Sequence, residues 1–315
     1  MSKVTIIGAG TVGSTIAYTL MLEGVSSEVL LIDILKDKAA GEAMDISQGV
    51  LFMNSANISS GDYDDAKGSD IVIITSGRGR KPGETRLDLA QTNVNIMKDI
   101  MGKIVPVCPD AVYVIVSNPV DILTYQFSKY SGLPESQVIG SGTILDTARL
   151  RSGIANHYKL NQQNIHAQVF GEHGDTSFVP WSIATIINIP IEDFEDGLSN
   201  KSIQYGKLDK EEIEHYMRTS GSNIISKKGV TNYAIAASVA HICKSIFSEV
   251  DRVMTISTML HGEYGVSNVC LSMPCVIGRR GVISRVETKI SCEERALMHK
   301  SADSLKKVIE GIDFN

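Results

Sequence analysis

The chain of 315 residues is longer than one ordinary hydrophobic core supports, which predicts two domains of modest size. Hydrophobic residues make up 43% of the chain and charged residues 21%, a composition that excludes a disordered protein. The net charge is -6, so the chain lacks the positive electrostatic field that would attract nucleic acid or anionic lipid. The chain has no signal sequence, no long apolar run and no CxxC pair among its five cysteines, so we expect a cytoplasmic protein without membrane span, metal site or disulfide.

The first half of the chain alternates short apolar segments with longer helical patterns. The first apolar segment is followed by a stripe at every fourth residue, Val12, Ile16 and Leu20, which is typical of a helix. The predicted strands, rich in Val and Ile, are residues 4–7, 29–32, 71–75 and 112–117. Strands buried on both faces that alternate with helices indicate a doubly wound parallel sheet. We therefore predict an α/β fold with a Rossmann domain over residues 1–142.

The pattern changes after residue 143, where long helical segments and then closely spaced strands follow. The predicted helices are residues 145–157, 210–226, 233–248 and 291–309. The predicted strands are residues 165–170, 254–260, 269–277 and 282–287. Glycines mark short turns between the last three strands, which predicts antiparallel pairing. Residues 143–315 are therefore expected to form an α+β catalytic domain with C-terminal antiparallel strands.

A glycine-rich turn lies between the first predicted strand and the first predicted helix. Residues 8–13 read GAGTVG, and a GxGxxG in this position is typical of a dinucleotide-binding turn. Gly8 permits the tight turn, Gly10 lets the backbone approach a diphosphate, and Gly13 lets helix and strand pack closely. The N–H groups at the start of the helix then face the phosphates. The cofactor-binding residues predicted here are Gly8, Gly10, Thr11, Val12 and Gly13.

Asp33 follows the second predicted strand, 20 residues after Gly13. A carboxylate at this place binds both ribose hydroxyls of NAD and repels the 2′-phosphate of NADP. The alternative is that Asp33 only caps a turn. Because strand, glycines and spacing agree, we predict that NAD is the cofactor.

Four further segments combine charged and polar residues with glycine or proline. They read KPGETR (81–86), SNPVD (117–121), GTILDTAR (142–149) and GEHGD (171–175). With these segments the chain resembles the L-lactate/malate dehydrogenase family nearly from end to end, and GEHGDT and GTILDTAR resemble its lactate branch. The resemblance implies an NAD-dependent L-2-hydroxy-acid dehydrogenase that exchanges a hydride with a small 2-oxo acid. It also implies a homotetramer, or at least a dimer.

His173 stands just past a predicted apolar strand, where its side chain can project into a cleft. Reduction of a 2-oxo acid needs a proton donor whose pKa lies near neutral pH, and histidine meets that need. A carboxylate on the other ring nitrogen would fix the tautomer and stabilise the imidazolium. The resemblance assigns these two catalytic roles to His173 and Asp146.

Arg149 lies three residues after Asp146, on the same face of a predicted helix. Its planar guanidinium suits bidentate binding of the substrate carboxylate.

Asn118 follows the end of a predicted strand, at the edge of the sheet where ligands bind in such folds. The resemblance implies that it hydrogen-bonds the substrate carbonyl, and we also place it among the cofactor-binding residues. Arg86 ends a loop that resembles the family's mobile lid, and lid closure would bring Arg86 to polarise the carbonyl while water is excluded.

Two residues give opposite indications about the substrate side chain. The resemblance places Arg80 where the lactate enzymes carry Gln and the malate enzymes carry Arg. An arginine closed against a pyruvate methyl would be an unpaired buried cation, whereas oxaloacetate supplies a carboxylate. Thr231 instead matches the lactate-type pocket. We rank malate/oxaloacetate slightly ahead of lactate/pyruvate, with a bulkier 2-oxo acid third and Arg78 without an assigned role.

Two further matches suggest regulation. Arg151 and His166 stand where bacterial allosteric lactate dehydrogenases bind fructose 1,6-bisphosphate across a subunit interface, so this sugar bisphosphate is a candidate effector. A non-catalytic NAD-binding protein is the competing hypothesis. Such a protein should have lost a member of the predicted catalytic set, and all its members are present.

Overall fold

The computed structural model describes residues 2–54, 56–79, 83 and 85–314, and for Arg86 it describes the backbone alone. The predicted Rossmann sheet is present as the parallel part of a nine-stranded sheet, in the order β12-β11-β10-β6-β5-β4-β1-β2-β3. The parallel strands are β1 (Lys3–Ile7), β2 (Glu28–Ile32), β3 (Asn57–Ser60), β4 (Ile71–Ile74), β5 (Val112–Ile115) and β6 (Val138–Gly140). The strand order reverses between β1 and β4, and ligands bind at such a switch point beyond the carboxyl ends of the strands.

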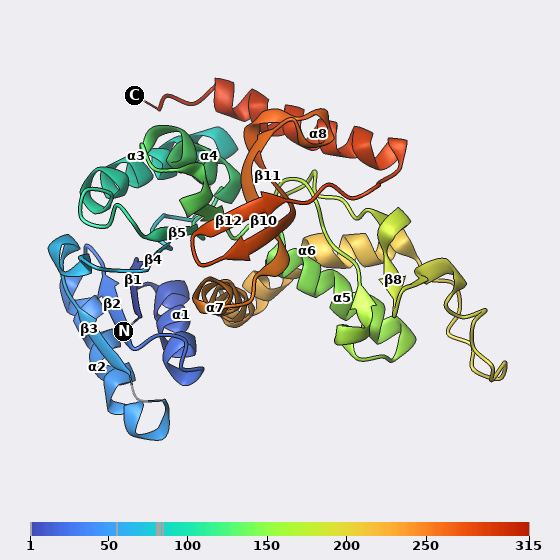
Figure 1. Ribbon diagram of the computed structural model, residues 1–315, viewed down its shortest axis with the longest axis horizontal. Helices are drawn as coiled ribbons and strands as arrows, with labels where there is room; N and C mark the ends of the chain where they lie inside the picture. The colour runs from blue at the N-terminus through green and yellow to red at the C-terminus, as the bar shows by residue number, and fades with distance from the viewer. Residues whose placement is uncertain (1, 55, 80–82, 84, 315) are drawn as a thin grey trace.

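Helices cover both faces of the parallel strands, as their almost uninterrupted apolar sequences predict. The helices of this half are α1 (Thr11–Leu22), α2 (Lys36–Gln48), α3 (Arg86–Ile104) and α4 (Val120–Tyr130). Helices α1 and α2 lie on one side of the strands, and α3 and α4 lie on the other (Figure 1). The sheet is therefore doubly wound, which confirms the predicted fold class.

The C-terminal strands pair antiparallel, also as predicted. They are β10 (Arg252–His261), β11 (Ser267–Gly278) and β12 (Gly281–Arg285). The sequence did not indicate that β10 also joins β6, through Ser257 and Gly140. A Cβ at Gly140 would lie 2.3 Å from Thr124 Oγ1 and 2.8 Å from the Ser257 Cβ, so only glycine permits this approach. The two predicted domains thus share one continuous sheet, and the boundary at residue 142 stays a prediction.

The long helices of the second half end within two residues of their predicted bounds. They are α5 (Ile144–Tyr158), α6 (Lys210–Lys228), α7 (Tyr233–Phe247) and α8 (Cys292–Glu310). Short 3-10 helices connect elements throughout the described chain: η1 (Val50–Phe52), η2 (Tyr63–Ala66), η3 (Glu135–Gln137), η4 (Gln162–Asn164), η5 (Trp181–Ile183), η6 (Ile191–Asp193) and η7 (Glu263–Gly265). None of the helices in the described residues is long and apolar enough to cross a membrane.

The strand predicted over residues 165–170 is wrong in its second half. Its first two residues form β7 (Ile165–His166), in a three-stranded sheet with β8 (Thr185–Ile186) and β9 (Ile189–Pro190), and its last residue, Phe170, makes an isolated bridge to Phe178. Beyond β7, side chains of α5 replace a neighbouring strand: the Arg151 Nε donates to the Ala167 carbonyl at 2.9 Å, and the Val169 N–H donates to Thr147 Oγ1 at 3.0 Å. An apolar segment therefore runs buried beside the helix without being a strand.

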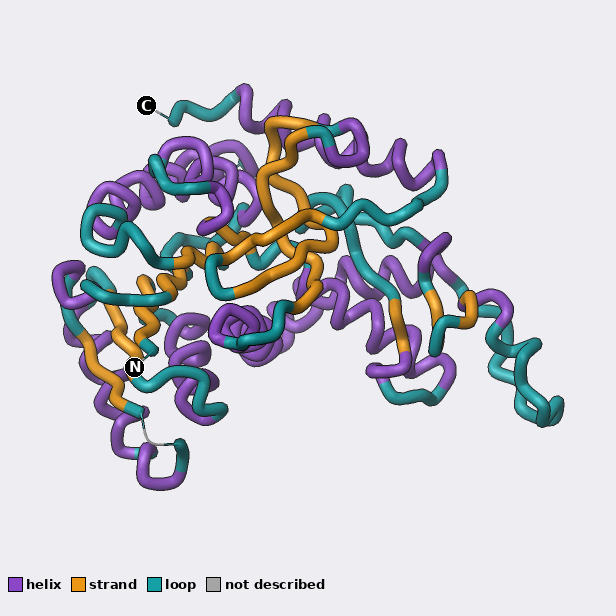
Figure 2. Tube along the Cα trace, viewed as in Figure 1, coloured by secondary structure: helices purple, strands orange, loops and turns teal. Residues whose placement is uncertain are grey.

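Two hydrophobic clusters hold these layers together. The larger one fills the space between the nine-stranded sheet and its helices, and it includes Val4 near the N-terminus and Ile312 near the C-terminus. The smaller one lies between α5, α6 and the three-stranded sheet, around Leu150 and Met217. The strands of the large sheet cross the centre of the molecule, and the small sheet stands apart at one end (Figure 2). Helix α5 begins where the two regions meet.

Candidate active site

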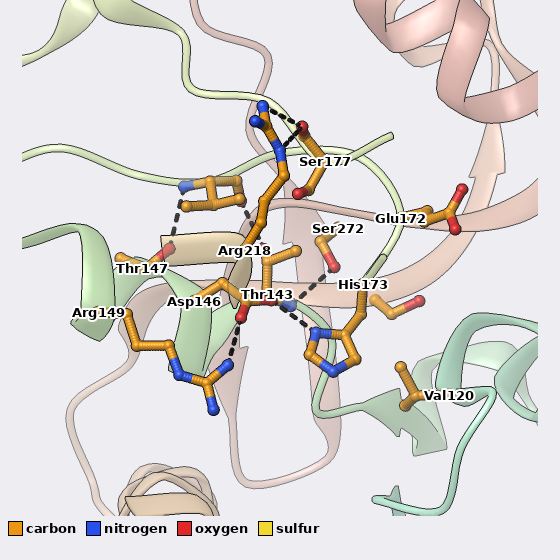
Figure 3. A network of polar contacts seen from close by, with 12 residues as sticks. Val120, Thr143, Asp146, Thr147, Arg149, Glu172, His173, Ser177, Arg218 and Ser272 are labelled. Atoms are coloured by element: carbon orange, nitrogen blue, oxygen red, sulfur yellow. Dashed lines mark hydrogen bonds and ion pairs between the residues drawn. The ribbon is translucent and has the colours of Figure 1, made fainter. Parts of the chain in front are cut away.

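The structure brings three of the predicted site residues together at the start of α5. Asp146 accepts hydrogen bonds from two sides: Arg149 Nη1 donates to Oδ1 at 2.8 Å, and His173 Nδ1 contacts Oδ2 at 2.6 Å (Figure 3). Asp146 and Arg149 are one helical turn apart, whereas His173 comes from the loop that follows Gly171. Nδ1 of His173 is committed to Asp146, and the other ring nitrogen, Nε2, has no hydrogen-bond partner among the described residues.

The charges of this group determine its protonation. Burial alone would raise the pKa of Asp146, but the His173 and Arg149 charges outweigh it and hold that pKa below its ordinary value. Burial would lower the pKa of His173, yet the Asp146 carboxylate raises it above its ordinary value. His173 is 28% exposed and Asp146 9%. The Asp146 carboxylate therefore favours the protonated form of His173.

His173 and Arg149 face a cavity of about 360 Å³ between the parallel sheet and α5, α6 and α7. The predicted residues Asn118, Thr231 and Val12 also line it, so the structure gathers these five residues around one space. Arg80 lies outside the described residues, and for Arg86 the structure gives only its place as the first residue of α3.

A second cavity, of about 700 Å³, begins at the glycine turn and is lined by Gly8, Gly10 and Asp33. Gly8 has a φ of +108°, and a Cβ at Gly13 would lie 1.8 Å from the Gly8 carbonyl oxygen, so both positions require glycine. A Cβ at Gly10 would meet nothing within 4 Å, which leaves the backbone at the start of α1 open to a ligand. Thr11 is the exposed first residue of that helix. This cradle fits a dinucleotide diphosphate.

Asp33 caps the turn after β2, and the ribose contact predicted for it stays a prediction. Its Oδ2 accepts from the Ala9 N–H at 2.7 Å and its Oδ1 accepts from the Leu35 N–H at 2.9 Å, so it does cap the turn. It also lines the dinucleotide cavity. The two backbone bonds hold the carboxylate in place, and each oxygen keeps a lone pair for a ribose hydroxyl.

Asn93 on α3 connects the two cavities. Its side chain accepts from the Arg78 N–H at 3.0 Å, donates to the Arg78 carbonyl at 3.2 Å, and donates to the Asn118 carbonyl at 2.7 Å. Asn118 precedes Pro119 in a cis peptide bond. Arg78, whose role the sequence does not indicate, lines both cavities. Asn93 thus fixes the backbone on which Arg78 and Asn118 are carried.

Asp121 is a buried residue of the site that sequence reasoning missed. It stands in the first turn of α4, where its Oδ2 accepts from the His173 N–H at 2.7 Å and its Oδ1 from Ser257 Oγ at 2.6 Å. Burial raises the pKa of Asp121 to about 6, against the two hydrogen bonds, which lower it. Asp121 is the last residue of the SNPVD motif, so the motif marks it as a candidate. Nothing in the sequence shows that Asp121 accepts a hydrogen bond from the backbone of the GEHGD loop.

The two predicted allosteric residues, Arg151 and His166, lie close together in the fold but do not line the same cavity. Arg151 donates to the carbonyl of Ala167, the residue after His166, and it lines a cavity of about 460 Å³ together with Gln168. His166 is exposed in β7 and does not line that cavity. Binding of fructose 1,6-bisphosphate by this pair stays a prediction.

Both halves of the chain match models of one protein family. The family model for the lactate/malate dehydrogenase NAD binding domain matches residues 2–140, and that for the lactate/malate dehydrogenase alpha/beta C-terminal domain matches residues 143–313. The chain is 47% identical over its full length to an L-lactate dehydrogenase of Thermoanaerobacter sp. (strain X514), which is also covered in full. It is 44% identical to an L-lactate dehydrogenase of Acetivibrio thermocellus, over 100% of this chain and 98% of that one.

Solved structures give the same result. A lactate dehydrogenase, MGS-M5, from a Medee basin deep-sea metagenome library superposes with a TM-score of 0.94 at 38% identity, covering 98% of both chains. The minor L-lactate dehydrogenase of Enterococcus mundtii, in a ligand-bound form, superposes with a TM-score of 0.93 at 34% identity, covering 100% of this chain and 99% of that one.

Proposed function

The chain belongs to the lactate/malate dehydrogenase family, and within it we propose that the protein is an L-lactate dehydrogenase that reduces pyruvate with NADH and catalyses the reverse reaction. It is an NAD-dependent 2-hydroxy-acid dehydrogenase, as the sequence predicted. The observation that carries the proposed reaction is the group His173–Asp146–Arg149, because it places a proton donor beside a carboxylate receptor in one cavity.

The preference for malate that Arg80 suggested is not supported by the comparisons, which fit the lactate alternative better. Relatives that match along the whole chain are named L-lactate dehydrogenases. Thr231, the lactate-type residue, lines the cavity beside His173 and Arg149. Arg80 lies outside the described residues.

In the proposed mechanism, Arg149 binds the substrate carboxylate through its guanidinium, of which Nη1 also donates to Asp146. The carbonyl oxygen then lies against His173 Nε2, which donates the proton as the alcohol forms. Asp146 stabilises the charged imidazole before transfer and fixes its tautomer. When bound, NADH supplies the hydride that reduces the carbonyl carbon. Asn118 and Arg86 are proposed to orient and polarise the carbonyl.

We further propose that the protein forms a homo-oligomer, a dimer or a tetramer. Large apolar side chains are exposed on α2 and η1: Met44 is 59% exposed, Leu51 85% and Phe52 84%. A monomer rarely leaves such side chains grouped in water, and a second copy would cover them. The mass in solution, measured by light scattering, tests this assembly.

The substrate is tested by comparing kcat/KM for pyruvate and for oxaloacetate, in the wild type and in Arg80→Gln. We expect the wild type to prefer pyruvate by about tenfold or more, which corresponds to roughly 1.4 kcal/mol in the transition state. Arg80→Gln should widen this preference, because it removes a cation that only a dicarboxylate can pair. Faster reduction of oxaloacetate by the wild type would return the function to malate dehydrogenase.

Asp121 adds a second negative charge behind His173 and contributes to its raised pKa. Asparagine at this position keeps an oxygen for the His173 N–H and a group for Ser257, but it removes the charge. Pyruvate reduction needs protonated His173, so its kcat/KM falls as the pH rises through that pKa. Asp121→Asn should lower the pKa of His173 and move this fall in kcat/KM to lower pH. The pH profile measures the change, with Asp110→Asn at an exposed turn as the control; identical profiles would contradict it.

A further inference from the structure

The loop between α6 and α7 is tied to the cofactor-binding helix α1 by one buried side chain, that of Asn232. Its Nδ2 donates to Thr15 Oγ1 on α1 at 3.0 Å, and its Oδ1 accepts from Lys228 Nζ at 2.6 Å. The residue is 7% exposed. Helices α1 and α7 lie side by side, which brings the loop against α1 (Figure 1).

The chemistry of the partners fixes the orientation of this amide. The Lys228 ammonium can only donate, so it must face Oδ1. Thr15 Oγ1 donates its own hydrogen to the Thr11 carbonyl at 2.6 Å, so toward Asn232 it can only accept. Both ends of the Asn232 amide are therefore satisfied, and the loss of either partner would leave a buried polar atom unpaired.

The Asn232 side chain does not make the capping hydrogen bond that asparagine usually makes at the start of a helix. Asn232 is the N-cap residue of α7, where an asparagine side chain ordinarily accepts from an N–H of its own helix. No such bond is present in α7. The side chain bridges two other elements instead, which indicates that the bridge has a purpose other than starting the helix.

Each end of the bridge leads to the substrate cavity. Thr231 precedes Asn232 and lines the cavity, and Val12, one helical turn before Thr15, lines the same cavity. Gly229 ends α6 with a φ of +86°, so the chain turns sharply into this short loop. The Thr15–Asn232 bond thus sets the distance between Thr231 on one side of the cavity and helix α1 on the other.

We propose that Asn232 is a positioning residue for substrate selectivity, which holds Thr231 against α1 and so keeps the pocket for the substrate side chain narrow. This inference rests on the proposed function, in which that side chain is a methyl group. With the bridge intact the pocket fits pyruvate, and with the bridge broken the loop moves outward and a longer 2-oxo acid enters. Asn232 itself does not line the cavity, so it acts through Thr231.

Thr15→Val is the sharpest test, because valine keeps the shape of threonine and removes the hydroxyl that accepts from Asn232. The ratio of kcat/KM for pyruvate to that for 2-oxobutyrate should fall by about tenfold, the lower end of the discrimination that a pocket achieves for one methylene group. The change should lie in KM, with kcat within about twofold of the wild type. Asn232→Ala should give the same fall, and the double variant should give no more, because both changes remove the same Thr15–Asn232 bond.

Two controls and a binding measurement complete the experiment. Thr15→Ser keeps the hydroxyl and should retain the wild-type ratio. Thr19→Val is the matched control, since among the described residues the Thr19 hydroxyl bonds only to the Thr15 carbonyl of its own helix. Affinity of the NADH complex for oxamate, a pyruvate analogue, should fall in Thr15→Val in parallel with the rise in KM, as measured by quenching of NADH fluorescence.

A lower Tm with an unchanged selectivity ratio in both Thr15→Val and Asn232→Ala would overturn the proposal and make the bridge a stabilising contact only. Failure of the proposed function has a different signature, because the wild type itself would then reduce pyruvate poorly. In that case the ratio is measured between oxaloacetate and a longer dicarboxylic 2-oxo acid, and an unchanged ratio overturns the proposal there too.

Discussion

His173→Asn is expected to lower kcat/KM for pyruvate reduction by about a thousandfold, within the range that a positioned general acid contributes. Asparagine occupies a similar volume but has no group that can donate the proton from the place of Nε2. Affinity for NADH should stay within about twofold of the wild type, because His173 lines the substrate cavity and not the cavity at the glycine turn. Steady-state kinetics and NADH fluorescence titration measure the two quantities. Equal losses of NADH affinity and of kcat/KM would show that the variant is misfolded or that His173 is not the donor.

Asp146→Asn tests the same proton from the other side of the imidazole. Asp146 raises the pKa of His173, so the fall of pyruvate reduction with rising pH should move to lower pH in the variant. The asparagine also allows the wrong tautomer, and the comparable change in a serine protease triad costs about ten-thousandfold. At pH 7.5 we therefore expect a loss of about a hundredfold or more in reduction. A variant within threefold of the wild type at every pH would remove Asp146 from the mechanism.

Most of the fold could be predicted from the sequence because its signals are local. Strands buried on both faces show as uninterrupted Val and Ile runs, and the helices show as four-residue stripes. The segment at residues 165–170 was wrong for the same reason, since an apolar run has the same appearance beside a helix as in a sheet. What decides between them is that Thr147 and Arg151 satisfy the backbone of this segment, and this depends on tertiary contact.

The site was predictable in proportion to how local its contacts are. Asp146 and Arg149 share a helical face at a spacing of three, which the sequence shows directly. The contact between His173 and Asp146 joins residues 27 apart and was expected only from the family resemblance. Asp121 and Asn93 were missed because each bonds to backbone groups, which every residue carries and no sequence pattern marks. The substrate side chain stayed ambiguous because Arg80 indicates a charged side chain and Thr231 an uncharged one.

Arg149→Lys is expected to raise KM for pyruvate by about a hundredfold, although the positive charge is kept. A guanidinium offers a planar pair of donors to a carboxylate, and hydrogen bonds to charged groups contribute roughly 1.5–3 kcal/mol each. Lysine is a point charge on a flexible stem, so it loses the bidentate geometry. It also weakens the 2.8 Å contact from Arg149 Nη1 to Asp146, and thereby the placement of His173, so kcat should fall as well.

The pyruvate analogue oxamate separates these two consequences, because its binding to the NADH complex needs no proton transfer. If Arg149 is the carboxylate receptor, the affinity for oxamate falls about as much as KM rises. If Arg149 serves only to hold Asp146, kcat falls while the oxamate affinity stays near that of the wild type. Arg280→Lys, in the exposed turn between β11 and β12, is the control for the exchange of arginine for lysine itself. We expect the first pattern, because the Arg149 guanidinium lines the cavity and is one turn from the carboxylate that holds the proton donor.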